Sequence, residues 1–406
     1  MSGAINSSPG IAALLAAPET VTVYFHGSTC PDGATAAAAL ALALPETVRS
    51  ALFSVPRDQL AKQGLPRFDA CVERGLPFFA GVHPNFVPLP ETVEGRHVIM
   101  ADLCMGLDHM EGALSVTVLD HHATGVDRMV KALCPSTAAL KLTEYSVDAR
   151  QAWALALSDR PGEIEDALRA ELRSVASLES SDIDTLARAA ATDLRHHVAS
   201  KRQLGFGLHL SLDMARSGAQ LAWDAVFPDE PRPPLVEYVA DRDLWLWKLP
   251  DSRSVSAALD VKQAFATIAD TVEWMTKFDA AKLAEQGAAY QECSALRVQR
   301  AVERSHQATL RVGTAVYRVQ VAFEVGEHSS IGGALACATP KGADQPPDFA
   351  AVLTVAPRGT SVSLRSSATC TIDMSQVAKS FGGGGHKHAA GFSIQGTDFK
   401  SVFTFE

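Results

Sequence analysis

The feature that most constrains the fold of this chain is an apolar run that ends in three side chains able to bind metal. Residues 116–119 read Val-Thr-Val-Leu, and Asp120, His121 and His122 follow them directly. Short β-branched runs predict buried strands, so the end of this one brings a carboxylate and two imidazoles into a small volume. Because adjacent histidines are also common in solvated turns, the triplet needs support from elsewhere in the chain.

Three further β-rich runs end in the same residue types. They are residues 21–25 before His26, residues 97–101 before Asp102, and residues 235–240 before Asp241. Helical stretches such as the Ala-rich residues 34–44 separate the runs, and this alternation predicts a parallel α/β sheet. The carboxyl ends of parallel strands share one edge, where ligand-binding groups gather. We therefore expect one site of Asp and His side chains, a donor set that suits Mn²⁺, Mg²⁺ or Zn²⁺.

The order of these motifs resembles that of the DHH phosphoesterase superfamily. This superfamily includes single-strand exonucleases, nano-RNA and cyclic-dinucleotide phosphodiesterases, and family II inorganic pyrophosphatases. Its first motif, His-x-x-x-Asp-x-Asp, corresponds to His26, Cys30 and Asp32, so a cysteine replaces the first aspartate. Asp102 matches the second motif, residues 120–122 the third, and Asp241 the fourth.

The resemblance implies a centre with two divalent metal ions, with Mn²⁺ as the expected ion and Mg²⁺ or Zn²⁺ as alternatives. The implied metal ligands are His26, Cys30, Asp32, Asp102, His121 and Asp241. Asp102 would be shared by both ions. The implied catalytic set is Asp32, Asp120 and His122, with His122 facing the scissile phosphate and Asp120 supporting the histidines.

Cys30 is the departure from the usual motif. A thiolate is a softer ligand than a carboxylate and favours Zn²⁺ or another borderline ion over Mg²⁺. Three interpretations remain open: Cys30 binds metal, it is a bystander beside a water ligand, or the first metal site is degraded. We favour a ligand, since His26, Asp32 and Gly33 match the motif. The alternative is a buried small apolar residue, the commonest role of a free cysteine.

A glycine-rich segment near the C-terminus is the second strong signal. Residues 381–392 read Phe-Gly-Gly-Gly-Gly-His-Lys-His-Ala-Ala-Gly-Phe. Glycines let backbone N–H groups approach an anion, and His386 adds a charge-assisted donor. The segment is similar to the Gly-Gly-Gly-His motif of the DHH-associated C-terminal domain. The resemblance implies substrate binding by Arg365, Ser366, Gly383, Gly384, Gly385 and His386.

Hydrophobic periodicity, taken with the resemblance, predicts the domain organisation. A chain of 406 residues with 47% hydrophobic content can bury at least two cores. We expect a parallel-sheet DHH catalytic domain over residues 1–255, with a helical insertion at about 145–205. A helical linker over 256–307 and a smaller α/β substrate-binding domain over 308–406 follow. The insertion suggests a packing element or an oligomerisation surface, the latter allowing a homodimer.

Charge and composition limit the classes of binding partner that we expect for this chain. The net charge of −10 argues against long duplex nucleic acid, which calls for a basic surface, but not against short single-stranded or nucleotide substrates. The 7 cysteines show no CxxC pairing, and no apolar run reaches the roughly 18 residues of a membrane span. The N-terminal apolar stretch lacks the preceding basic residues of a signal peptide. We therefore expect a cytoplasmic protein with no membrane partner.

The function expected from these features is metal-dependent phosphodiester hydrolysis. The favoured substrates are short oligonucleotides or dinucleotides, cleaved to mononucleotides by a water that two metal ions activate. One alternative is an exopolyphosphatase or pyrophosphatase, which would use the same metals. Another is a non-catalytic scaffold that retains the fold. The sequence leaves the substrate, the cleavage direction and the oligomeric state open.

Overall fold

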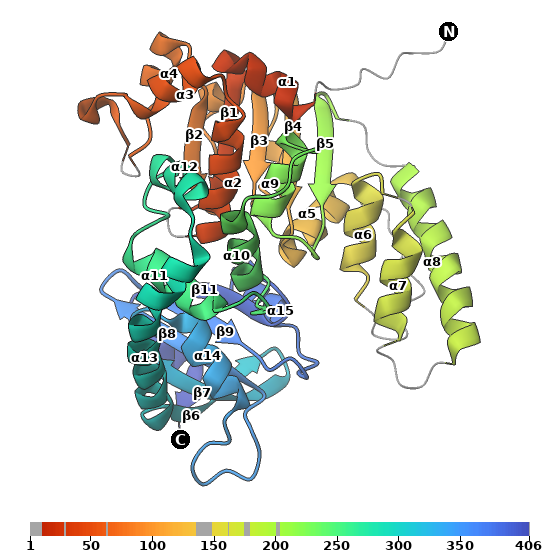
Figure 1. Ribbon diagram of the computed structural model, residues 1–406. Helices are drawn as coiled ribbons and strands as arrows, with labels where there is room; N and C mark the ends of the chain where they lie inside the picture. Colours follow the sequence, from red (N-terminus) through yellow and green to blue (C-terminus); the bar gives the residue numbers. More distant parts are fainter. Residues whose placement is uncertain are drawn as a thin grey trace. The chain divides into compact units, whose positions relative to one another are not determined.

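The structure, a computed structural model, describes residues 10–27, 30–61, 64–134, 148–160, 162–173, 179–199 and 204–405. The chain forms two compact units, Met1–Gly287 and Ala288–Glu406. The first contains a parallel sheet of five strands and the second a mixed sheet of seven (Figure 1). The predicted fold class, α/β with a parallel-sheet first part and a smaller α/β second part, is confirmed. The predicted linker, residues 256–307, is divided between the two units.

The parallel sheet of the first unit has the order β2-β1-β3-β4-β5. Its strands are β1 (Val21–His26), β2 (Phe78–Val82), β3 (His97–Ala101), β4 (Ser115–Asp120) and β5 (Gly207–Leu212). The first part of this unit also contains helices α1 (Ile11–Ala16), α2 (Pro31–Leu42), α3 (Glu46–Phe53), α4 (Phe68–Arg74) and α5 (Ala123–Leu133). Three of the four predicted strands are confirmed, and they lie side by side as β1, β3 and β4.

Side chains of β1 alternate between two hydrophobic cores. Val21, Val23 and Phe25 pack in a core with α2 and α9 (Gly218–Val226), while Tyr24 joins the core on the other face of the sheet. This period of two is the expected geometry of a strand that is buried on both faces. Both faces are covered, so the carboxyl edge of the sheet is the place where polar side chains can gather.

The predicted insertion consists of three helices beyond the β5 edge of the sheet (Figure 1). They are α6 (Arg150–Leu157), α7 (Ile164–Leu172) and α8 (Ser180–Ala199). Leu155, Leu168 and Leu194 are buried in the same core as Val118 of β4 and Leu210 of β5. The insertion is therefore an extension of the sheet's second core.

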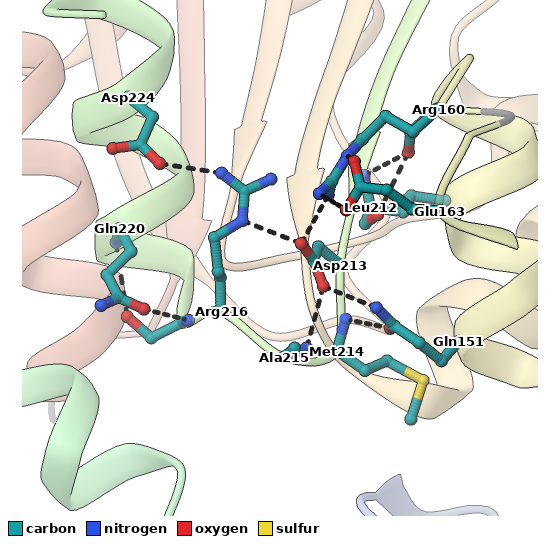
Figure 2. A network of polar contacts seen from close by, with 12 residues as sticks. Gln151, Arg160, Glu163, Leu212, Asp213, Met214, Ala215, Arg216, Gln220 and Asp224 are labelled. Atoms are coloured by element: carbon teal, nitrogen blue, oxygen red, sulfur yellow. Dashed lines mark hydrogen bonds and ion pairs between the residues drawn. The ribbon is translucent and has the colours of Figure 1, made fainter. Parts of the chain in front are cut away.

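A polar network ties the insertion to the sheet (Figure 2). Asp213, directly after β5, accepts hydrogen bonds from Gln151 at 2.7 Å and Arg160 at 2.5 Å, both supplied by the insertion. Arg216 also donates to Asp213 at 2.9 Å and reaches Asp224 of α9 at 2.8 Å. Burial opposes ionisation of Asp213, but these donors outweigh it and lower its pKa to about 2. One buried carboxylate thus links insertion, sheet and α9.

The fourth predicted strand, residues 235–240, is wrong. These residues belong to helix α10 (Pro234–Asp243), which begins at Pro234. Proline is well suited to the first helical turn because its fixed φ and missing N–H cost nothing there. An apolar run of six residues does not distinguish a strand from a buried helix. Leu235, Val236 and Val239 are buried as the spacing of one helix face requires.

Helices follow up to the second unit. They are α11 (Ser252–Val261), α12 (Ile268–Lys277) and α13 (Ala280–Glu303), the last confirming the predicted long connecting helix. In the parts of the chain that the structure describes, no helix has the length and apolarity that a membrane crossing requires.

The sheet of the second unit has the order β10-β11-β9-β8-β7-β6-β12. Its strands are β6 (His306–Val312), β7 (Ala315–Phe323), β8 (Phe349–Ala356), β9 (Gly359–Arg365), β10 (Gly384–Gly385), β11 (Ala389–Gln395) and β12 (Phe403–Phe405). Helices α14 (His328–Cys337) and α15 (Met374–Lys379) complete the unit. Only β7 and β8 pair in parallel, with α14 as the connection between them. The predicted α/β character of residues 308–406 is confirmed.

Candidate metal centre

Neighbouring strand ends bring the predicted ligands together. His26 ends β1, Asp102 follows β3, and His121 follows β4, and these three strands are adjacent in the sheet. Two sets of ligand atoms each lie within 4.8 Å of one another. The first set is His26, Cys30 and Asp102, and the second is Asp32, Asp102 and His121.

Asp102 lies at the centre of this cluster. Its Oδ1 is 3.0 Å from Nε2 of His121, while its Oδ2 is 3.4 Å from Nδ1 of His26 and 3.5 Å from Sγ of Cys30. Each oxygen therefore faces a different group of ligands, as a carboxylate shared by two metal ions does. The backbone of Asp102 has φ 56°, a left-handed conformation that is strained for a residue with a Cβ. Such strain concentrates at functional sites, where the surroundings enforce it.

Asp32 is held by the start of α9. Its Oδ2 accepts a hydrogen bond from the backbone N–H of Gly218 at 2.6 Å, and its Oδ1 accepts one from Ala219 at 3.0 Å. Its Oδ2 also lies 3.5 Å from Nε2 of His121. Helix N-termini favour negative charge, so α9 fixes this carboxylate in the cluster. A Cβ on Gly218 would lie 2.4 Å from the Cβ of Asp102, so only glycine fits this approach.

Asp243 contacts the cluster at the place expected for Asp241. Asp241 is buried, and its carboxylate accepts hydrogen bonds from the backbone N–H groups of Lys248 at 2.8 Å and Leu249 at 3.3 Å. Oδ2 of Asp243 lies 3.3 Å from Nε2 of His121. The neighbouring Arg242 does not neutralise Asp243, since its guanidinium pairs with Asp260. The segment is the end of a helix, in which residues two apart point in different directions. The prediction of a strand therefore could not show which of the two carboxylates faces His121.

His122 and Asp120 form a second pair beside the cluster. Nδ1 of His122 lies 2.8 Å from Oδ1 of Asp120, and the same oxygen accepts the backbone N–H of His121 at 2.9 Å. Since a carboxylate only accepts, Nδ1 of His122 is the donor. Asp120 thereby holds the ring of His122 and the backbone of His121.

His83 is a nearby residue that the sequence reading did not select. It follows β2 directly, and its ring centroid is 6.4 Å from that of His26. The sequence does contain the pattern that would have selected it. An apolar run, residues 78–82, directly precedes His83, just as residues 21–25 precede His26. His83 is exposed, so it contributes a polar group at the margin of the cluster.

Burial and mutual charge shift the pKa values of Asp32, Asp102, Asp243 and Cys30. Burial, with the charges of Asp102 and Asp243, raises the pKa of Asp32 well above its ordinary value. Burial likewise raises the pKa of Asp243, and burial with the neighbouring carboxylates raises that of the Cys30 thiol. Hydrogen bonds from His121 and His26 outweigh burial and lower the pKa of Asp102.

His121 lies where the negative charge of this centre is concentrated. Burial opposes its protonation, but the hydrogen bond to Asp102 and the charges of Asp243, Asp102 and Asp32 raise its pKa to about 10. The cause is geometric: Nε2 of His121 lies within 3.5 Å of a carboxylate oxygen of Asp32, of Asp102 and of Asp243. A single N–H cannot satisfy three carboxylates, whereas a divalent cation in this space would. The donor set of carboxylate, imidazole and thiol fits such ions.

The predicted substrate-binding arginine lies in the second unit, at the end of β9. Arg365 is partly buried and donates hydrogen bonds to Ser329 Oγ at 2.7 Å, Ser363 Oγ at 3.0 Å and the Leu364 carbonyl at 2.8 Å. Burial lowers its pKa to about 10. It forms no ion pair with a carboxylate of the described chain. A guanidinium without a counter-charge is a suitable binding group for an anion.

Ser366 and the glycine-rich segment lie close to Arg365 along the sheet. Ser366 Oγ is 2.9 Å from Nδ1 of His388, and Ala389 of β11 pairs with Arg365 of β9. Gly384 and Gly385 pair with β11. The N–H of Gly383 bonds to the Ala378 carbonyl and that of His386 to the Ala389 carbonyl, so these two N–H groups are used within the chain.

Close packing also requires glycine in this segment, in addition to the expected contact with an anion. A Cβ on Gly383 would lie 2.0 Å from the carbonyl oxygen of Gly391. The segment needs glycine there in order to lie against β11. The expected contact of an anion with the glycine-rich backbone remains a prediction.

Comparison with known proteins gives distant relatives. No protein-family model matches the sequence. An uncharacterized protein of Acanthamoeba polyphaga mimivirus is 27% identical over 198 residues, which are 48% of this chain and 44% of that protein. The match thus spans less than half the length of the viral protein. Among solved structures, the pGpG-specific phosphodiesterase PggH of Vibrio cholerae is similar over 92% of each chain, with 10% identity and a TM-score of 0.34. The case for a function therefore rests on the residues of the metal centre.

Proposed function

We propose that this chain is a metal-dependent phosphodiesterase of the DHH type that hydrolyses short oligonucleotides or dinucleotides to mononucleotides. The observation that carries the proposal is the position of His121, whose Nε2 lies within 3.5 Å of Asp32, Asp102 and Asp243. Two buried carboxylates and a third that is partly buried, all around one point, call for a strong cationic partner. Divalent metal ions supply that charge and lower the pKa of a bound water so that it can attack phosphorus near neutral pH.

The chain offers two groups of ligands for such ions. His26, Cys30 and Asp102 form one group, and Asp32, Asp102 and His121 form the other, with Asp243 beside them. The shared carboxylate of Asp102 supports a centre with two ions. Mn²⁺ is the proposed ion for the oxygen-rich group.

His122 is proposed to act on the substrate. Its Nδ1–H is bound to Asp120, which fixes the orientation of the ring, and the ring is proposed to contact a phosphate oxygen. A donor placed at an oxygen that gains charge in the transition state lowers the barrier, typically by about 3 kcal/mol. Asp120 would act as a positioning residue for this ring.

Short substrates are favoured by the charge of the chain. A net charge of −10 opposes long polyanions, whereas a few phosphates can be neutralised by metal ions and local cations. Arg365 of the second unit is proposed as one such cation.

The test is hydrolysis of a substrate panel by the metal-depleted protein after addition of Mn²⁺, Mg²⁺ or Zn²⁺. The panel contains dinucleotides, longer labelled oligonucleotides, a cyclic dinucleotide, polyphosphate and pyrophosphate. We expect mononucleotide release that falls by roughly 100-fold or more in Asp102→Asn and His121→Ala, since even indirect supports of metal ligands are worth 10- to 100-fold. His196→Ala, at an exposed histidine of α8, is the matched control and should retain wild-type activity.

Three results would contradict the proposal. Release of orthophosphate from polyphosphate without nucleotide cleavage would make the chain a phosphoanhydride hydrolase. Metal-dependent hydrolysis that survives in both Asp102→Asn and His121→Ala would place the catalytic centre elsewhere. A protein that binds metal but hydrolyses nothing in the panel would be a scaffold with the fold of an enzyme.

A further inference from the structure

The loop that follows Asp243 carries two tryptophans that the proposed chemistry does not use. Trp245 is 44% exposed, although indole side chains are usually well buried. Trp247 is partly buried, and its Nε1–H has no hydrogen-bond partner among the described residues. By contrast, Trp223 of α9 is 6% exposed and fills a core. Core packing therefore does not explain why a tryptophan stands at position 245.

The backbone of this loop is strained and firmly held. Trp245, Trp247 and Asp251 have φ of 56°, 53° and 51°, a region that residues with a Cβ rarely adopt. Asp241 enforces the loop: its carbonyl accepts the N–H groups of Leu246 and Trp247, and its carboxylate accepts those of the next two residues. Strained conformations persist when the surroundings over-determine them, and they mark functional segments. Asp241 thus presents the two indoles in a fixed position.

Arg253 completes an aromatic and cationic surface. Its guanidinium carbon lies 4.2 Å from the ring centroid of Trp247 and 5.6 Å from that of Trp245. The two indole centroids are 5.0 Å apart. Arg253 is exposed and makes no hydrogen bond or ion pair within the described chain. Its donors are therefore available to a ligand while its plane lies against the indoles.

The surface adjoins the metal centre along the chain. Trp245 is two residues after Asp243, whose carboxylate is 3.3 Å from His121. Two trans peptide units span at most about 7.6 Å between Cα atoms. A ligand that has its phosphate at the centre and a planar group attached to it can therefore extend over Trp245.

We propose that Trp245 and Arg253 form a stacking site for the nucleobase of the nucleotide whose phosphate is cleaved. The inference rests on the proposed function and adds a recognition element for the base. An indole face binds any base because every base has a π-face, and an arginine adds a cation–π contribution and hydrogen-bond donors. The site would distinguish nucleotides from polyphosphate and pyrophosphate, which have no planar group.

The experiment compares a dinucleotide with two analogues that each lack the base on one sugar. With the wild-type protein, KM should rise by roughly 10-fold or more for the analogue that lacks the stacked base. Trp245→Ala should raise KM for the complete dinucleotide by a similar factor, leave KM for that analogue unchanged, and leave kcat within about twofold. Trp245→Phe should restore most of the affinity, and Arg253→Lys, which keeps the charge without the planar fork, should not.

Leu246→Ala is the matched control, since Leu246 is 47% exposed in the same loop but is not aromatic. Its KM values should equal those of the wild type. Equal losses on the dinucleotide and on both base-free analogues in Trp245→Ala would overturn the inference, because they would indicate a purely structural role of the loop. An unchanged KM in Trp245→Ala would overturn it as well.

Binding without turnover separates this inference from the proposed function. Calorimetric titration of the metal-depleted protein with the dinucleotide and with its base-free analogues reports stacking even if no hydrolysis occurs. Binding that depends on the base and is lost in Trp245→Ala would support the stacking site even if the protein hydrolysed none of the substrates. Base-independent binding would overturn it even if dinucleotides were hydrolysed.

Discussion

Cys30 stands where the motif that this chain resembles usually has an aspartate, and its Sγ lies near ligand atoms of His26 and Asp102. Its Sγ is 3.5 Å from the carboxylate of Asp102, which also contacts His26. A donor set of imidazole, thiol and carboxylate prefers Zn²⁺ or Co²⁺, whereas the set around Asp32 suits Mn²⁺ or Mg²⁺. The two groups of ligands therefore differ in the ions that they favour.

Replacement of Cys30 by aspartate should change the metal preference. The Co²⁺-loaded wild type is expected to show a near-ultraviolet charge-transfer absorption from thiolate to metal, and Cys30→Asp should lose it while Mn²⁺ affinity increases. Absorption spectra and equilibrium metal titration measure both effects. Cys293→Ser, at an exposed thiol, is the control and should keep the absorption. An unchanged spectrum in Cys30→Asp would make Cys30 a bystander.

A second residue-scale prediction concerns Gly218. A methyl group at this position would lie 2.4 Å from the Cβ of Asp102, so Gly218→Ala must displace either Asp102 or the start of α9. We expect a loss of about 1–3 kcal/mol in the free energy of unfolding and weaker metal binding, measured by urea denaturation and calorimetry. Gly205→Ala, where no atom lies within 4 Å of the new Cβ, should change neither quantity.

At the scale of elements, the strand-end pattern predicted which side chains come together. Residues 21–25, 97–101 and 116–119 predicted strands, and the carboxyl ends of parallel strands share one edge of a sheet. The segment before Asp241 was misread because a short apolar run does not reveal its period, and with it the choice between Asp241 and Asp243 was lost. His83 was missed because a single histidine after a strand carries little information without its neighbours in space.

The Asp213 network should make stability depend on pH. The pKa of Asp213 is lowered to about 2, against about 3.9 in an unfolded chain. Its contribution of about 2 kcal/mol is therefore present above pH 4 and is lost as the pH falls through 2. Urea denaturation between pH 6 and pH 2.5 should show a steeper loss for the wild type than for Asp213→Asn. Asp184→Asn, at an exposed ion pair with Arg169, should behave as the wild type.

The insertion should unfold together with the sheet. Leu168 of α7 is fully buried in the core that α6, α8, β4 and β5 share. Leu168→Ala is expected to cost about 2–5 kcal/mol and to lower the denaturation midpoint of the first unit as a whole. Far-ultraviolet circular dichroism and tryptophan fluorescence should report the same midpoint. A separate early transition, limited to the insertion, would contradict a shared core.

At the scale of the whole molecule, the two units have separate hydrophobic cores. The cores of the first unit draw on residues up to Leu283 and Ala284, and those of the second begin at Val298 and Ala301. The proposed metal ligands, from His26 to Asp243, all belong to the first unit. Ligand binding stabilises only the folded unit that contains the site.

Calorimetry should therefore resolve two unfolding transitions, of which metal ions raise only one. At an ion concentration of 100 times Kd the affected transition gains about 2.7 kcal/mol. His121→Ala should abolish this gain and leave the other transition unchanged. A single transition that shifts as a whole with metal would show that the units unfold as one.

The ligands of the centre are spread over a long stretch of chain, from His26 to Asp243. During synthesis at about 5–20 residues per second, the interval between these two residues is on the order of 10–40 seconds. The nascent chain can form early helices in that time, but it holds an incomplete set of carboxylates and thiols. If the centre binds metal as proposed, capture has to follow the folding of the first unit, because an ion that reaches the emerging chain sooner meets only part of the ligand set.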